Sequence, residues 1–197
     1  MIAAPAAMRD RLAGRLLALI LPVALLAAGC RAPDGSVDGA GRSADVRAER
    51  ARRAIRATLD ELYAAFCFDP GAEPDWETQR RIYLEGAVFV PSIRPDRPPA
   101  GDDTERFLAD FRAFARSESF RDTGFHERIV GTRIEVFGGV AHAFVAFEGF
   151  APGDGETQTV GLDSLQLVFD GERWRLVSFT TQFEREGLPL PARFRDS

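Results

Sequence analysis

The sequence predicts an α+β domain in which helices come first and an antiparallel sheet follows. Apolar residues recur at helical spacing as far as Ala115, and from Phe125 onward they alternate with a period of two. Two glycine-containing pairs, Gly138-Gly139 and Asp170-Gly171, separate alternating runs. Such pairs are typical of two-residue hairpin turns, because the central residues need positive φ angles. We therefore expect two consecutive β-hairpins after the helices.

Three helices are expected before the sheet. The first spans 44–66 and buries a stripe that consists of Ile55, Leu59, Leu62, Tyr63 and Phe66. The second is short, with Asp75 as its N-cap and Gly86 as its end. A short strand over 87–90 and a proline-rich loop over 91–101 follow. Asp103 or Thr104 caps the third helix, whose stripe is Phe107, Leu108, Phe111, Phe114 and Ala115.

The turns fix a register for the strands. In the first hairpin, 126–137 and 140–150, Phe137 pairs with Val140 and Glu135 with His142. Its core face then holds Val130, Ile134, Val136, Ala141, Ala143, Val145 and Phe147. In the second hairpin, 161–184, Leu167 pairs with Trp174 and Asp163 with Ser178. This register places Asp163, Ser178, Thr180 and Gln182 on the inner face, and Leu162, Val177, Phe179 and Phe183 on the outer face.

Composition limits the function classes. The chain has 197 residues, 45% of them hydrophobic, which suits one domain with a proper core. A net charge of -5 argues against a nucleic-acid partner. With two histidines and no Cys/His spacing, we expect neither a metal site nor a cofactor.

The N-terminus has the features of a secretory signal over residues 1–29. Arg9, Arg11 and Arg15 precede the uncharged apolar run 16–28, and Met8 is an alternative start. The following Leu26–Cys30 segment, LAAGC, resembles the lipobox of bacterial lipoproteins, which implies lipid on Cys30 and anchorage in the cell envelope, periplasmic or outer-membrane. An ordinary signal peptide is the alternative. Residues 30–43 are expected to form a flexible tether, and Cys67 a buried thiol.

Five segments resemble a known family. They are LYAAFCFDPGAEPDW (62–76), LEGAVFV (84–90), GFHER (124–128), AHAFVAFE (141–148) and GLDSLQLVFDGERWRLVS (161–178). They resemble the bacterial SnoaL-like branch of the nuclear transport factor 2-like superfamily and cover most of 50–186. The resemblance implies a cone-shaped α+β fold, with three N-terminal helices packed on a curved, mainly antiparallel sheet. It leaves function open, because the superfamily includes isomerases, dehydratases, cyclases, hydrolases and binding domains.

Polar residues are expected to meet in a pocket at one end of the inner face. His126 and Asp163 are the candidate catalytic pair, because histidine titrates near neutral pH and a carboxylate can orient it. The candidate ligand-binding residues are Tyr63, Arg128, Thr159, Ser178, Thr180 and Gln182. The alternative is that His126 lies at the rim and Asp163 satisfies backbone groups at the strand ends.

Three functions remain open. The first is an envelope-anchored domain, 44–186, that binds a small, partly apolar molecule in its cone. The second is an isomerase, cyclase or dehydratase that uses proton transfer. The third is a non-catalytic interaction module whose cone is filled by its own side chains.

The apolar outer face predicts a homodimer. Phe179 would lie near the centre of its interface. Alternatively the C-terminal tail, 187–197, folds back through Leu188, Leu190 and Phe194 and covers the same face.

Overall fold

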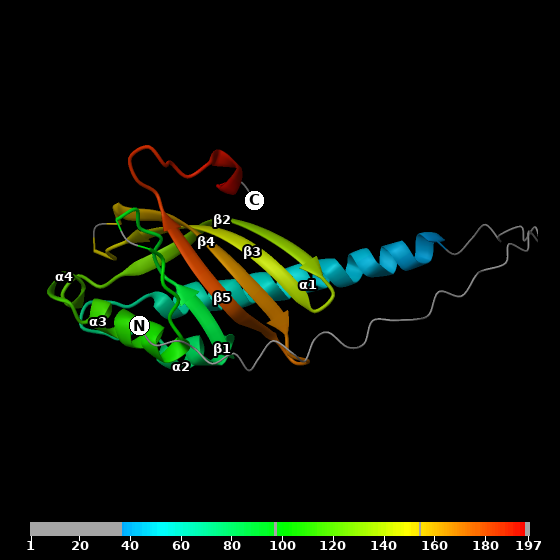
Figure 1. Ribbon diagram of the computed structural model, residues 1–197, viewed down its shortest axis with the longest axis horizontal. Coiled ribbons are helices and arrows are strands. Elements are labelled where there is room, and N and C mark those ends of the chain that lie inside the picture. The colour runs from blue at the N-terminus through cyan, green and yellow to red at the C-terminus, as the bar shows by residue number, and fades with distance from the viewer. Residues whose placement is uncertain (1–36, 97, 154, 196–197) are drawn as a thin grey trace, which may run out of the picture. The chain divides into compact units, whose positions relative to one another are not determined.

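Helices pack on one face of a curved five-stranded sheet in the computed structural model, which describes residues 37–96, 98–153 and 155–195 (Figure 1). The strand order is β1-β5-β4-β3-β2, with β1 parallel to β5 and the other neighbours antiparallel. The elements are α1 (Val37–Phe66), α2 (Trp76–Ile82), β1 (Tyr83–Val90), α3 (Thr104–Ala115), α4 (Glu118–Arg121), β2 (His126–Phe137), β3 (Val140–Phe150), β4 (Thr157–Phe169), β5 (Trp174–Phe183) and the 3₁₀ helix η1 (Ala192–Phe194). This α+β architecture is the predicted one.

The helices follow the sequence signals closely, with two differences at their ends. Asp75 and Asp103 cap α2 and α3 by accepting hydrogen bonds from backbone amides. The prediction that α2 runs to Gly86 is wrong: the chain enters β1 at Tyr83, and Gly86 has a φ of 80° inside that strand. α1 begins at Val37, so the later part of the predicted tether is helical.

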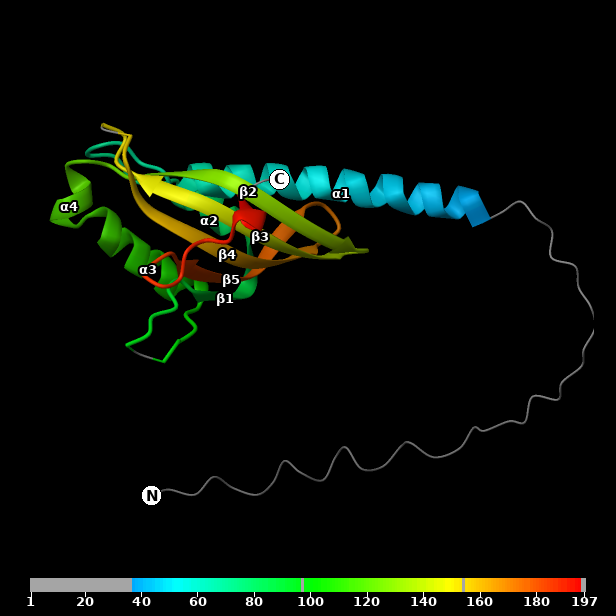
Figure 2. The same cartoon turned by 90° about the horizontal axis from the view of Figure 1, so that it is seen from above.

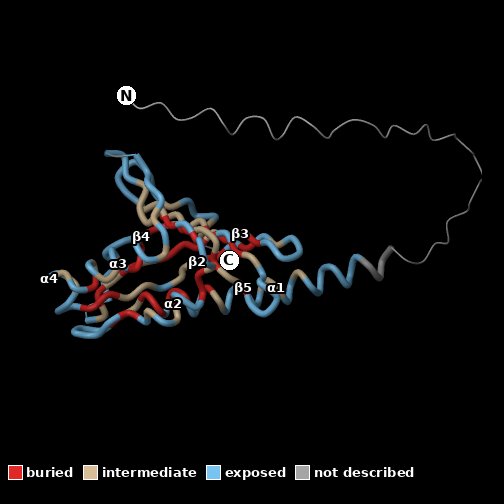
Figure 3. Tube along the Cα trace, turned by 60° about the horizontal axis from the view of Figure 1, so that its bottom comes forward, coloured by how far each residue is buried: buried red, intermediate tan, exposed pale blue. Residues whose placement is uncertain are grey.

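The core lies between the inner face of the sheet and the apolar stripe of α1. The second half of α1 lies alongside β2 (Figure 2). The buried residues lie along the sheet and this half of α1, whereas residues 41–50 of α1 are mostly exposed (Figure 3). Trp174 is buried in the core, as its place in the pattern predicted. The predicted signal peptide and Cys30 lie outside the described residues, and no described helix is both long and apolar enough to cross a bilayer.

The last hairpin differs from its predicted register because its turn is longer and β5 contains a bulge. Four residues, Asp170–Arg173, form the turn, and the Asp170 side chain accepts hydrogen bonds from the amides of Glu172 and Arg173. Further along, Leu167 pairs with Leu176 but Gln166 pairs with Ser178, which leaves one extra residue on β5. Beyond this bulge the two faces of β5 are exchanged relative to the prediction.

A second bulge has the same effect on β2. The turn at Gly138-Gly139 and the pairing of Phe137 with Val140 are confirmed. However, Ile129 pairs with Phe147 and Gly131 with Ala146, so Val130 is the extra residue. Val130 is therefore only half-buried, and Ile129 packs against the core in its place.

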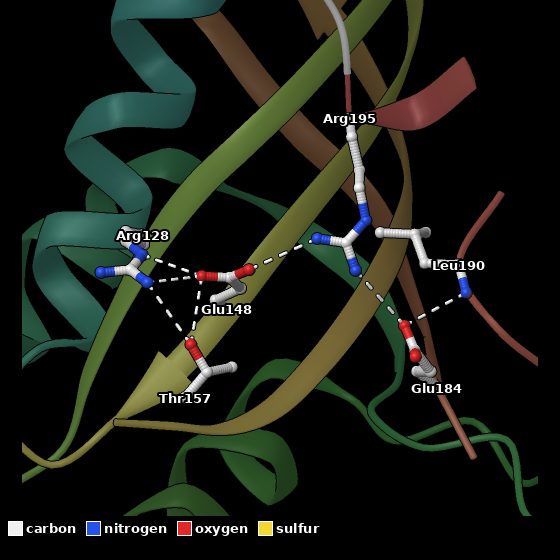
Figure 4. A network of polar contacts seen from close by, with 6 residues as sticks. All are labelled: Arg128, Glu148, Thr157, Glu184, Leu190 and Arg195. Carbon is white, nitrogen blue, oxygen red and sulfur yellow. Dashed lines mark hydrogen bonds and ion pairs between the residues drawn. The ribbon is translucent and has the colours of Figure 1, made fainter. Parts of the chain in front are cut away.

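The C-terminal tail covers part of the outer face of the sheet. The Phe194 ring packs on Phe144, with 5.3 Å between ring centroids. Arg195 lies 3.4 Å from Glu148 and 3.5 Å from Glu184, and Glu184 also accepts a hydrogen bond from the Leu190 amide (Figure 4). The tail thus occupies outer-face surface, as the alternative to a dimer anticipated.

The proposed centre of the homodimer is wrong, because Phe179 faces inward and is only 6% exposed. The bulge on β5 is the physical reason. A homodimer stays a prediction, but Phe179 cannot contribute to its interface.

Tail packing depends on Gly131, which yields a test. A Cβ atom added there would lie 1.8 Å from the Phe194 carbonyl oxygen. Gly131→Ala should therefore displace the tail and lower the free energy of unfolding by about 1–3 kcal/mol. Tryptic cleavage after Arg185 and Arg193, together with urea unfolding, measures both effects. Gly153→Ala is the control, since nothing lies within 4 Å of its added Cβ; equal cleavage of the two variants would contradict the assignment.

Candidate functional site

A cavity of about 250 Å³ opens at one end of the inner face. Phenylalanines from the helices and strands form most of its wall: Phe66, Phe107, Phe111, Phe114, Phe120, Phe125, Phe147, Phe179 and Phe183. The polar residues that line it are Glu127, Gln158, Thr159, Asp163 and Thr181. Among the described residues that line it, none is positively charged. The cavity is thus apolar over most of its surface and acidic at one place.

Asp163 is the most deeply buried polar group of the site. It lies on β4 and is 1% exposed. One carboxylate oxygen, Oδ2, accepts a short hydrogen bond from the Tyr63 hydroxyl, which α1 brings into the core. The other oxygen, Oδ1, is buried without a hydrogen-bond partner among the described residues. Because a buried polar atom without a partner is costly, this oxygen needs an explanation beyond folding.

Burial controls the protonation of Asp163 and Tyr63. It raises the pKa of Asp163 to about 7, although the hydrogen bond from Tyr63 and, to a smaller extent, the neighbouring Thr181 side chain lower that pKa in part. Burial, followed by the neighbouring Asp163 charge, raises the pKa of Tyr63 well above its usual value. At neutral pH the tyrosine therefore keeps its proton and donates a hydrogen bond to Asp163, and Asp163 itself can gain or lose a proton.

Glu127 is the second acid of the cavity. Removal of its carboxyl group from water, together with the Asp163 charge, raises its pKa well above the usual value. Its backbone is held by Cys67, whose Sγ lies 3.3 Å from the Glu127 amide nitrogen. Burial raises the pKa of that thiol too, so Cys67 is a structural neighbour and not a nucleophile. Glu127 can thus serve as a hydrogen-bond donor beside Asp163.

The predicted pair of His126 and Asp163 does not form. His126 lies on the opposite face of the sheet, where its Nε2 is 3.1 Å from Asp69 Oδ1. Arg128 lies on that face too and binds Glu148 and Thr157 (Figure 4). The bulge at Val130 is the reason, because it exchanges the two faces of β2 at this end of the strand.

Some of the other predicted residues lie at the cavity, and the rest lie on the outer face of the sheet. Thr159 and Asp163 line the cavity, and Tyr63 lies behind them, hydrogen-bonded to Asp163. The assignment of Ser178, Thr180 and Gln182 to the cavity is wrong, since they pair with Gln166, Ser164 and Leu162 on the outer face. The bulge on β5 places Phe179, Thr181 and Phe183 at the cavity instead.

Three polar residues of the cavity, Glu127, Gln158 and Thr181, were missed from the sequence. Glu127 stands between His126 and Arg128, and strict alternation assigned it to the solvent side. Strict alternation likewise assigned Thr181 to the outer face. No residue type at either bulge indicates its presence.

The described residues contain no cluster of three or more His, Cys, Asp or Glu side chains that could hold a metal ion. What the site offers chemically is an acid–base pair of carboxyl groups in an aromatic cavity, with a tyrosine that fixes one of them.

Comparison with known proteins shows the fold. No family model matches the sequence, and no curated protein matches it either. A structure from Novosphingobium aromaticivorans, an NTF2-like protein with a cystatin-like fold, is similar at 16% identity and a TM-score of 0.55, over 82% of this chain and 97% of that one. A candidate dehydratase of the NTF2-like family from Streptomyces avermitilis is similar at 13% identity and a TM-score of 0.52, over 70% and 98%. A protein of unknown function from Nostoc punctiforme is similar at 11% identity and a TM-score of 0.54, over 68% and 90%. The chain therefore has the cystatin-like fold of NTF2-like proteins, as its segment order and motifs predicted.

Proposed function

We propose that this domain binds a small, largely apolar and uncharged molecule in its cavity and moves a proton at Asp163. The single observation that supports it is the Asp163 carboxylate, whose Oδ1 is buried at the cavity without a hydrogen-bond partner among the described residues, while Tyr63 donates a hydrogen bond to Oδ2. An unsatisfied oxygen of this kind is suited to abstract a proton from a bound molecule.

The cavity wall limits the class of ligand. Phenylalanine rings favour an apolar, ring-containing body, and the acids disfavour an anion because no positive side chain offsets their charge. An apolar cavity of about 150 Å³ holds benzene, so about 250 Å³ accommodates a somewhat larger molecule. A carbonyl or hydroxyl group is the polar feature that the acids could bind.

Each acid has a separate role in the proposed reaction. Ionised Asp163 takes a proton from the carbon next to a carbonyl group, and the electron pair moves onto the carbonyl oxygen. Protonated Glu127 donates a hydrogen bond to that oxygen as negative charge develops on it. Return of the proton to another carbon gives isomerisation, and loss of a hydroxyl group gives dehydration. Tyr63 is a positioning residue, because it touches Asp163 and does not line the cavity.

We further propose that the domain is anchored in the bacterial envelope through Cys30. The LAAGC segment and the apolar run before it support this.

Proton abstraction predicts exchange of carbon-bound hydrogen. A neutral aromatic ketone, 2-tetralone, incubated with the protein in D₂O should lose its α-proton NMR signals faster than in buffer. Asp163→Asn should lower the rate by about 100-fold or more, and Glu127→Gln by about 100-fold. Glu172→Gln, an exposed glutamate of the last turn, is the control and should keep the wild-type rate. Tetralone that binds without accelerated exchange would support binding alone and contradict catalysis.

The raised pKa of Asp163 predicts how stability depends on pH. Its folded-state pKa of about 7 lies above the unfolded value of about 4. Between these values the folded protein holds a proton that the unfolded chain releases, so the free energy of unfolding falls as pH rises. Relative to Asp163→Asn, the wild type should lose about 2–3 kcal/mol between about pH 5 and about pH 8. Urea unfolding at both values measures it; a difference that does not change with pH would show that this carboxyl group titrates normally.

The anchor predicts a change in cell fractionation. Cys30→Ser should remove the lipid and release the protein from the membrane fraction. Cys67→Ser is the matched control, because Cys67 is the free cysteine of the described domain and should not affect fractionation. Membrane association that survives Cys30→Ser would contradict a lipid anchor on that residue.

A further inference from the structure

The end of the domain opposite the cavity carries exposed apolar side chains. Phe137, Val140 and Phe169, here called the hairpin tip, are 86%, 54% and 46% exposed. They flank the β2–β3 and β4–β5 turns. The two turns are joined, because the Phe169 amide donates a hydrogen bond to the Gly139 carbonyl, at 2.9 Å. The tip is therefore one surface, and it has no part in the cavity.

A basic stretch of α1 lies at the same end. Over residues 41–56 the helix carries six arginines against two acidic residues, in a chain whose net charge is -5. The six, here called the basic segment, are Arg42, Arg47, Arg50, Arg52, Arg53 and Arg56. All but half-buried Arg52 are exposed. In this stretch Ala51 and Ile55 pack on the core, and Arg52 and Arg53 pair with Glu49 of the same helix. Six arginines against two acidic residues still leave an excess of positive charge on the surface of this helix.

Both views place these features together. The first half of α1 runs past the β2–β3 turn, and α4 and the start of β4, which border the cavity, lie at the other end (Figures 1 and 2). A partner that met the hairpin tip would therefore meet the basic segment too.

We propose that the hairpin tip and the basic segment form a docking surface for a bilayer that contains anionic phospholipid. Aromatic side chains favour the boundary between headgroups and acyl chains, and arginines attract anionic headgroups. A second copy of the chain fits less well, because a two-fold contact would bring arginine against arginine.

The sequence before α1 also supports a bilayer at this end of the domain. The apolar run 16–28 precedes Cys30, and residues 31–36 separate Cys30 from the first residue of α1. Six residues span at most about 20 Å. With the proposed anchor in a bilayer, the basic segment would be close to the headgroups, and the cavity mouth would face away from them.

The docking surface is tested with the full chain and vesicles. Cys30 and Cys67 are replaced by serine, and an environment-sensitive NBD fluorophore is attached to Phe137→Cys. Leu188→Cys, in the C-terminal tail and also exposed, is the matched label position. Phosphatidylethanolamine/phosphatidylglycerol vesicles should shift NBD emission to the blue at position 137 only, and nitroxide lipids should quench it. Phosphatidylcholine vesicles should give little shift.

Charge removal separates the bilayer from other occupants. Replacing Arg50, Arg53 and Arg56 by glutamine should weaken docking of the label by about 100-fold, and high salt should act alike. An unshifted label on vesicles that carry the protein down in sedimentation would overturn the proposal. So would a shift that rises with protein concentration without lipid, since that indicates a second copy. Exchange of 2-tetralone protons should not change in the arginine variant, so failure here is distinguishable from failure of the proposed function.

Discussion

The hydrogen bond from Tyr63 to Asp163 links the longest helix to the middle of the sheet, and the site depends on it. Tyr63 belongs to the apolar stripe of α1, and Asp163 lies on the inner face of β4. Neither group could be buried alone without a large penalty. Together they satisfy the hydroxyl and one carboxylate oxygen, which leaves the second oxygen available at the cavity. The same contact thus fixes the helix and prepares the carboxylate.

The sequence was sufficient for the main helices and strands and for the turn of the first hairpin. The helical stripes, the caps at Asp75 and Asp103 and the Gly138-Gly139 turn all lie in local residue patterns, which determine local structure directly. Trp174 was also assigned correctly, because it precedes the bulge in β5. The membership of each face was less predictable, because one unpaired residue reverses alternation for the remainder of a strand.

The candidate site shows the consequence of this sensitivity. No bulge separates Asp163 and Thr159 from the turn that fixes their register, so alternation assigned them to the cavity face correctly, and Tyr63 reaches Asp163 from the stripe of α1. Glu127 and Thr181 lie beyond a bulge, and alternation exchanged them with His126, Thr180 and their neighbours. A bulge is stabilised by packing across strands and by twist, which are tertiary properties. A single sequence therefore predicted one acid of the cavity, but not the second acid.

The two bulges also bear on how related sequences should be aligned. Loss of Val130 would restore strict alternation in β2 and leave its other pairs intact, because Ile129 and Gly131 already pair with consecutive residues of β3. Glu127 would therefore stay at the cavity. Loss of the extra residue in β5 would likewise leave Thr181 at the cavity. A bulge can thus be gained or lost within these strands while the cavity keeps the same residues, and an alignment that treats strands as gap-free would place the wrong neighbours there.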